Sequence, residues 1–81
     1  MAAKKETITV EFAGMEFQAD AAACRSWSVI RGISKGGPAM FDALDRMFEG
    51  RADEYAEKLA DDFADMANLA ARCIEEAGSK N

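Results

Sequence analysis

The chain begins with a strict alternation of apolar and polar side chains. In TITVEF, residues 7–12, an isoleucine, a valine and a phenylalanine share one face, and threonines and a glutamate share the other. This period of two predicts a half-buried strand. Ala13-Gly14 is a turn signal, and MEFQA, residues 15–19, is the expected return strand. The pattern therefore predicts an N-terminal β-hairpin.

A two-residue turn fixes which side chains of the hairpin face each other. The apolar positions then pair on one side, as Phe12 with Met15, Val10 with Phe17, and Ile8 with Ala19. The same register places Glu11 opposite Glu16, an unfavourable pair of about 0.2–1 kcal/mol that a glycine bulge would relieve. Because an isolated hairpin is barely stable in water, we expect helices to cover its apolar face.

After the hairpin the apolar spacing becomes helical. Asp20 is a good N-cap for a helix that extends to about Ile33. Its predicted apolar side contains Cys24, Trp27, Ile30 and Ile33 or Ser34. We expect Trp27 to pack this helix against the hairpin, and Lys35-Gly36-Gly37 to end it.

A second helix is predicted to start at Pro38, whose missing N–H is tolerated in a first turn. Gly50 is its expected stop. Its apolar positions cover more than one face, and they are Met40, Phe41, Leu44, Met47 and Phe48. A helix that is apolar over this width either lies in the middle of the domain or contacts another chain.

The third helical segment is predicted from about Asp53 to about Ala77. One apolar stripe follows it, formed by Tyr55, Leu59, Phe63, Met66, Ala70, Cys73 and Ala77. We favour one long helix, kinked near 61–62, over two pieces of which Asp61-Asp62 caps the second. The predicted fold is α+β and mostly α, with a β-hairpin and three helices in a single domain, 1–81, whose residues 1–5 and 79–81 are frayed.

Charge and composition exclude several classes of function. The formal net charge is −5, whereas proteins that bind nucleic acid or anionic membranes in general need a cationic surface. The N-terminal residues lack the apolar run of a secretory signal, and no stretch approaches a membrane span. Cys24 and Cys73 predict free core thiols in a reducing cytosol, with a single disulfide as the alternative. A chain of 81 residues has a thin core, so homo-oligomerisation would help it.

The segment GISKGG, residues 32–37, superficially resembles a phosphate-binding loop. A Walker A loop needs a lysine followed by Ser or Thr, placed between a buried strand and a helix. Here Lys35 precedes a glycine pair, and the preceding segment is a predicted helix. We therefore interpret GISKGG as an interhelical joint.

No catalytic constellation is recognisable. The chain has no histidine, its serines therefore have no histidine partner, and both cysteines lie on predicted apolar faces. Asp53, Glu57, Asp61 and Asp65 recur every four residues along the third helix, a spacing that does not converge on one metal ion. They form either a solvated face or a docking site for a basic partner segment. We therefore expect no enzyme activity, no metal and no cofactor.

The candidates for partner contacts are large apolar residues and this acidic row. Flexible methionines fill irregular cores and also serve adaptable binding surfaces. The full candidate set is Trp27, Met40, Met47, Phe48, Asp53, Glu57, Asp61 and Asp65.

The order of segments resembles the tail assembly chaperones of long-tailed, siphovirus-type bacteriophages and prophages. The resemblance covers roughly residues 7–78. It lies in the opening strand "ITVEFAGMEF", the acidic helix start and tryptophan of "DAAACRSW", and the helix "FDALDRMFEG" after a glycine-containing break. The tyrosine-bearing acidic helix "DEYAEKLAD" and the final "MANLAARCIEEAG" complete it.

The resemblance implies a non-catalytic protein of the bacterial host cytoplasm. Such chaperones bind the tape-measure protein, help to recruit tail-tube subunits, and are not expected in the mature virion. Two alternatives stay open. One is a structural head–tail component of a phage or prophage, and the other is a small acidic regulator that masks a basic protein.

Overall fold

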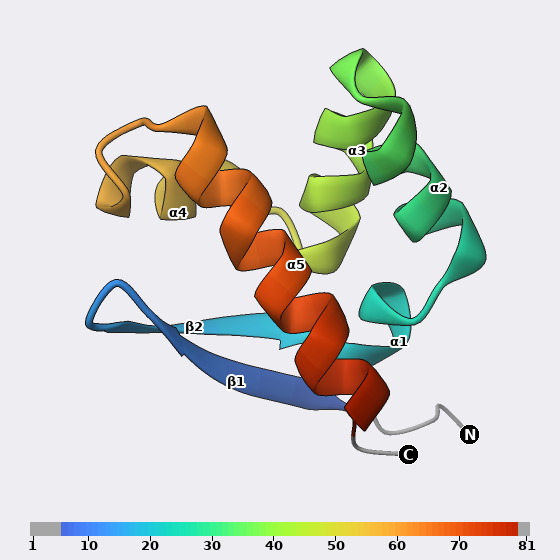
Figure 1. The fold of residues 1–81 in the computed structure, drawn as a ribbon, viewed down its shortest axis with the longest axis horizontal. Coiled ribbons are helices and arrows are strands. Elements are labelled where there is room, and N and C mark those ends of the chain that lie inside the picture. The colour runs from blue at the N-terminus through green and yellow to red at the C-terminus, as the bar shows by residue number, and fades with distance from the viewer. Residues whose placement is uncertain (1–5, 80–81) are drawn as a thin grey trace.

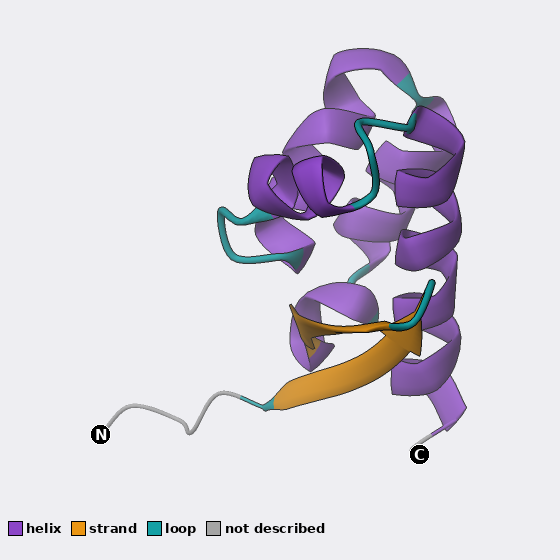
Figure 2. Ribbon diagram, turned by 90° about the vertical axis from the view of Figure 1, so that its left-hand side faces the viewer, coloured by secondary structure: helices purple, strands orange, loops and turns teal. Residues whose placement is uncertain are grey.

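The computed structural model describes residues 6–79. Strands β1 (Thr7–Phe12) and β2 (Met15–Asp20) precede five helices, α1 (Ala21–Cys24), α2 (Trp27–Lys35), α3 (Gly37–Met47), α4 (Ala52–Lys58) and α5 (Phe63–Ser79) (Figure 1). The hairpin lies below most of the helices, and α5 runs down past it on one side (Figure 2). The α+β class is thus confirmed, but the described residues form five helices, not three. Residues 1–5 and 80–81, predicted to be frayed, lie outside the described part, whereas Ser79 is the last residue of α5.

The hairpin has the predicted register. Val10 pairs with Phe17, and the other apolar pairs follow from it. Ala13 and Gly14 have φ values of 54° and 76°, which suits a two-residue turn with both central residues left-handed. Glu11 lies opposite Glu16 as the register predicts, and no bulge relieves this pair. One face is buried, with Ile8, Val10, Phe17 and Ala19 at 5%, 4%, 1% and 0% exposure.

The first predicted helix is in fact two helices. Asp20 caps α1 as expected, because its carboxylate accepts the Ala22 N–H at 3.0 Å. The chain then leaves the helix at Arg25, and Ser26 caps α2 by accepting the Val29 N–H. The break resets the helical phase, so that Val29 is buried and Trp27 faces solvent. The prediction that Trp27 packs against the hairpin is therefore wrong.

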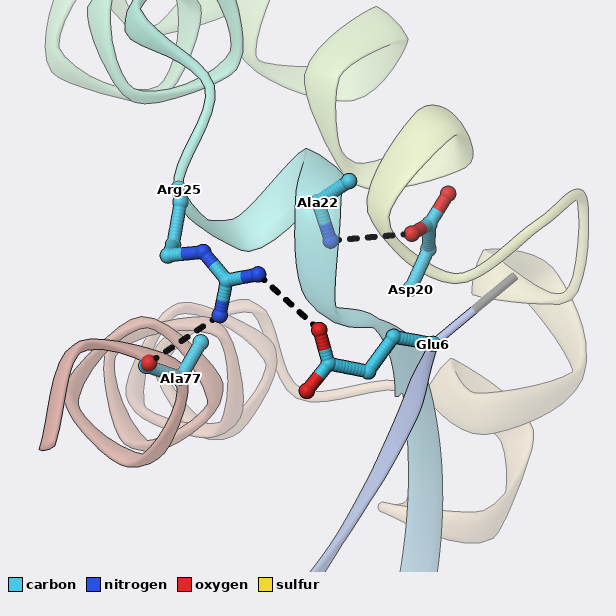
Figure 3. A network of polar contacts seen from close by, with 5 residues as sticks. All are labelled: Glu6, Asp20, Ala22, Arg25 and Ala77. Atoms are coloured by element: carbon cyan, nitrogen blue, oxygen red, sulfur yellow. Dashed lines mark hydrogen bonds and ion pairs between the residues drawn. The ribbon is translucent and has the colours of Figure 1, made fainter. Parts of the chain in front are cut away.

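Arg25 stabilises this break from the side. Its guanidinium donates to the Ala77 carbonyl at 3.2 Å and to the Glu6 carboxylate at 3.0 Å (Figure 3). The first contact satisfies a carbonyl near the end of α5, where backbone acceptors lack helical partners. Arg25 thus joins the α1–α2 connection, the start of β1 and the end of α5.

α3 packs against α2, α1 and β2 and buries Met40, Ala43, Leu44 and Met47, but Phe41 on its apolar side remains 56% exposed. Gly36 caps α2 and precedes α3, and Pro38 lies in the first turn of α3. A Cβ atom at Gly32 would lie 2.9 Å from the Ala39 carbonyl oxygen, so glycine permits the close packing of α2 on α3. α3 ends at Met47, and Gly50 belongs to the turn that follows, where its N–H donates to the Asp45 carbonyl at 2.8 Å.

The long third helix is also two helices. Ala60 and Asp61 adopt left-handed backbone conformations, with φ of 61° and 59°, which ends α4. Asp62 then caps α5, since its carboxylate accepts the Asp65 N–H at 2.9 Å. The favoured single helix was therefore wrong, and the alternative of a second piece capped at Asp61-Asp62 is confirmed. None of the helices within residues 6–79 combines the length and the hydropathy that a membrane span requires.

Candidate protein-binding groove

Three of the predicted partner contacts are core residues. Met40, Met47 and Phe48 are 6%, 0% and 0% exposed, because β2 and α1 pack against α3. The Phe48 ring also meets the Tyr55 ring edge to face, with centroids 5.1 Å apart. In this structure the three side chains belong to the core and present no surface, and their role as partner contacts stays a prediction.

The predicted acidic row is split between two helices and the turn that joins them. Asp53 and Glu57 lie on α4, Asp61 lies in the turn, and Asp65 lies on α5. The row assumed one continuous helix, so the break at residues 59–62 removes its common face. Asp53 and Asp61 nevertheless line one hollow, whereas Glu57 and Asp65 do not.

This hollow is a groove between α3, α4 and the start of α5, with a volume of about 340 Å³. Its apolar lining comprises Phe41, Leu44, Ala52, Ala56, Phe63 and Met66. Phe41 and Phe63 are 56% and 58% exposed, and their rings meet edge to face with centroids 6.4 Å apart. We call this hollow the Phe41–Phe63 groove. Two large exposed aromatic rings beside an apolar hollow are typical of a protein-binding site.

Carboxylates surround the apolar lining. Asp45, Asp53, Asp61 and Asp62 contribute to the wall, and none of the described residues that line the groove is lysine or arginine. Such a rim keeps the open groove hydrated and gives it a negative potential. The groove is therefore suited to a segment with apolar side chains flanked by cationic ones.

Among the exposed side chains of this groove, sequence reasoning missed four as binding residues. They are Phe41, Phe63, Asp45 and Asp62. The sequence held one signal for Phe41. The apolar positions of α3 cover more than one face of the helix, which is more than its contact with the core can bury. Another was Asp62, which precedes Phe63 as an N-cap would and so places that ring at the first turn of a new helix.

Trp27 remains a candidate partner contact. It is 76% exposed, at the first position of α2. It does not line the Phe41–Phe63 groove, so the two exposed aromatic sites are separate.

The two cysteines are buried and free, at 1% and 0% exposure. The hydrogen bond with Cys24 and the burial of the site raise the pKa of the Cys73 thiol well above its ordinary value. Cys73 is therefore a protonated core side chain at neutral pH. Among the described residues, no group of three or more Cys, Asp or Glu side chains is placed to bind a metal ion.

Comparisons with known proteins add no relative. No protein-family model, no curated protein and no solved structure matches this chain. The surface chemistry of the groove is therefore the ground for a functional proposal.

Proposed function

We propose that this chain is a non-catalytic tail assembly chaperone, which binds an apolar helical segment of the tape-measure protein and helps to recruit tail-tube subunits. The Phe41–Phe63 groove is the observation that supports the proposal. The segment order of the sequence supplies the more specific assignment to tail assembly. The chaperone acts in the cytoplasm of the bacterial host and leaves before the virion is complete.

The groove favours an amphipathic helix as its occupant. Such a helix places apolar side chains at positions i, i+3, i+4 and i+7 into an apolar groove of its partner. Full burial of a fully exposed phenylalanine is worth about 1.5–3 kcal/mol, and covering Phe41 and Phe63, which are 56% and 58% exposed, would be worth roughly half of that for each ring. Lysines or arginines that flank the apolar positions would meet Asp45, Asp53, Asp61 and Asp62.

A co-expression experiment tests the proposal. The chain is produced with tape-measure segments from the same phage, and both solubility of the segment and co-purification are measured. The variant F41S/F63S should lose at least tenfold in affinity, because it removes both exposed rings. Ile30→Ser is the matched control, since Ile30 is also an exposed apolar helix residue (36%) but does not line the groove.

Two outcomes would overturn the proposal. One is binding that F41S/F63S leaves unchanged while circular dichroism shows that the variant is folded. The other is abundant protein in purified mature virions, which would favour the head–tail structural component.

The acidic rim favours a second candidate, a regulator that masks a basic protein. Its binding would depend on charge more than on the aromatic rings. Replacement of Asp53 and Asp61 by asparagine would then abolish binding, and 0.5 M NaCl would do the same, whereas F41S/F63S would bind almost normally.

A further inference from the structure

A second hollow lies on the other flank of α3, against α2. Its volume is about 350 Å³, and Trp27, Arg31, Lys35 and Arg46 line it together with Asp42. In Figure 1, α2 lies on one side of α3, and α4 and the start of α5 lie on the other. We call the four residues Trp27, Arg31, Lys35 and Arg46 the Trp27 face. The two hollows thus share α3 but open on opposite flanks of it.

The Trp27 face is a local cationic surface on an acidic chain. It presents three exposed cationic side chains and one carboxylate, while the whole chain carries a formal charge of −5. Arg46 is oriented by its hydrogen bond to the Ser28 hydroxyl at 3.0 Å. Trp27 projects from the capped start of α2 and is the only tryptophan. An aromatic ring beside cations on a rigid element is typical of an interface hot spot.

We propose that a second copy of this chain docks its Trp27 face into the Phe41–Phe63 groove of the first. The two surfaces are complementary in chemistry. The Trp27 ring would meet the exposed Phe41 and Phe63 rings, since aromatic pairs favour edge-to-face contacts. The three cations would face the four aspartates of the rim. Charge complementarity thus selects another copy of this chain as the occupant.

The geometry makes the contact head to tail. One molecule cannot join its own two surfaces, because they open on opposite flanks of α3. Each copy therefore offers one groove and one Trp27 face, and such heterologous contacts build closed rings or open filaments. In this assembly the groove of one copy is covered by the next, so a client segment and a second copy compete for it. The self-association itself does not depend on the tail-assembly role.

A charge-exchange experiment tests the proposal with the purified full chain. Sedimentation should show a mass that rises with protein concentration and falls with salt. The groove variant D53K/D61K and the face variant R31E/K35E should each be monomeric, because each pair of substitutions places two charges opposite the like charges of the unchanged partner surface. An equimolar mixture should assemble again, since the intact face of the first variant fits the intact groove of the second.

Tryptophan fluorescence locates the contact, because Trp27 is the only tryptophan. Its emission should shift to shorter wavelength as the wild-type chain assembles, and the shift should be absent in D53K/D61K. Trp27→Ala should weaken self-association at least tenfold and leave tape-measure binding intact, whereas F41S/F63S should lose both. Failure of self-association alone is thereby separated from failure of the proposed function.

Three results would overturn the inference. They are a chain that stays monomeric at millimolar concentration, a mixture of the two charge variants that stays monomeric, and an assembly in which Trp27 emission does not change. If the Trp27 face instead binds an acidic peptide while the chain remains monomeric, that face serves another protein and the second-copy proposal is wrong.

Discussion

The two ends of α5 continue one apolar stripe but have opposite surroundings. Towards its C-terminus, Leu69, Cys73 and Ala77 are fully buried, while at its first residue Phe63 is 58% exposed. The hairpin and α1 cover the first region, which we call the closed end. The start of α5 instead borders the Phe41–Phe63 groove. Apolar periodicity therefore identifies the side chains that another element can bury. The neighbouring elements of the same chain determine which of these side chains are buried and which stay exposed.

At the closed end, polar side chains also form hydrogen bonds that link separate elements of the fold. The Arg25 guanidinium donates hydrogen bonds to the Ala77 carbonyl and to the Glu6 carboxylate at this end. At the opposite end of α5, which borders the Phe41–Phe63 groove and which we call the open end, the charged residues of the lining are all carboxylates. The contacts at the closed end stabilise the fold, whereas the open end presents an exposed surface that is suited to a partner.

The largest expected difference between the ends comes from truncating one side chain at each. Leu69→Ala should lower the free energy of unfolding by about 2–5 kcal/mol, since it leaves a cavity in the core. Phe63→Ala removes more atoms but should cost less than about 1 kcal/mol, because the ring is mostly solvated. Urea denaturation measures both values. Equal losses would show that the groove is part of the folding core.

Tyr55→Phe should have the next largest effect. The Tyr55 hydroxyl donates to the Gln18 carbonyl at 3.1 Å and accepts the Gln18 N–H at 3.2 Å. Removing it leaves both backbone groups without this partner, at a cost of about 1–3 kcal/mol in unfolding free energy. Lys58→Met is the control, because it removes only the cation 5.9 Å from the Tyr55 ring and should cost about 0.5 kcal/mol. Similar thermal midpoints for the two variants would contradict this ranking.

The Arg25 contacts should contribute less. Arg25→Met keeps much of the apolar stem but loses both hydrogen bonds, and we expect a loss of about 1–1.5 kcal/mol. Glu6→Gln weakens only the exposed ion pair and should cost about 0.2–1 kcal/mol. Denaturation at 0.1 M and 1 M NaCl separates the two, since salt should erase the Glu6 effect and leave most of the Arg25 effect. A loss for Arg25→Met that salt erases completely would argue against a contribution from the Ala77 contact.

The smallest expected effect is a pH dependence at the closed end. The pKa of Cys73 is raised in the folded chain above its ordinary value of 9.0, so folding favours the protonated thiol. The contribution of Cys73 to the free energy of unfolding is fully present below the pKa that the thiol has in the unfolded chain. It declines as the pH rises above that pKa. The hydrogen bond between the two thiols also lowers the pKa of the Cys24 thiol, which offsets part of this loss, so the net loss should stay below about 1 kcal/mol at pH 9.5. Cys73→Ala should be less stable throughout but show a flatter profile between pH 8 and 9.5, and an unchanged slope would assign the effect to another group.

The sequence by itself determined the features that depend on residues close to one another along the chain. Strict alternation and the Ala13-Gly14 turn specified the hairpin and its register, because a shift of one residue would expose the whole apolar face. Pro38 correctly indicated the start of α3, and the spacing of its apolar positions indicated a buried side, which holds Met40, Leu44 and Met47. These interactions are local, so their energies can be judged from the chain alone.

Only the tertiary structure decided where the helices break and which apolar side chains stay exposed. Ser26 and Asp62 can cap a helix or lie within one, and the choice between these states depends on the packing that each makes possible. The break before Trp27 turned a predicted core residue outward, and the break before Phe63 created the wall of the groove. Periodicity specifies a face of one helix, whereas burial requires a second element to cover it, and that second element is supplied by the fold.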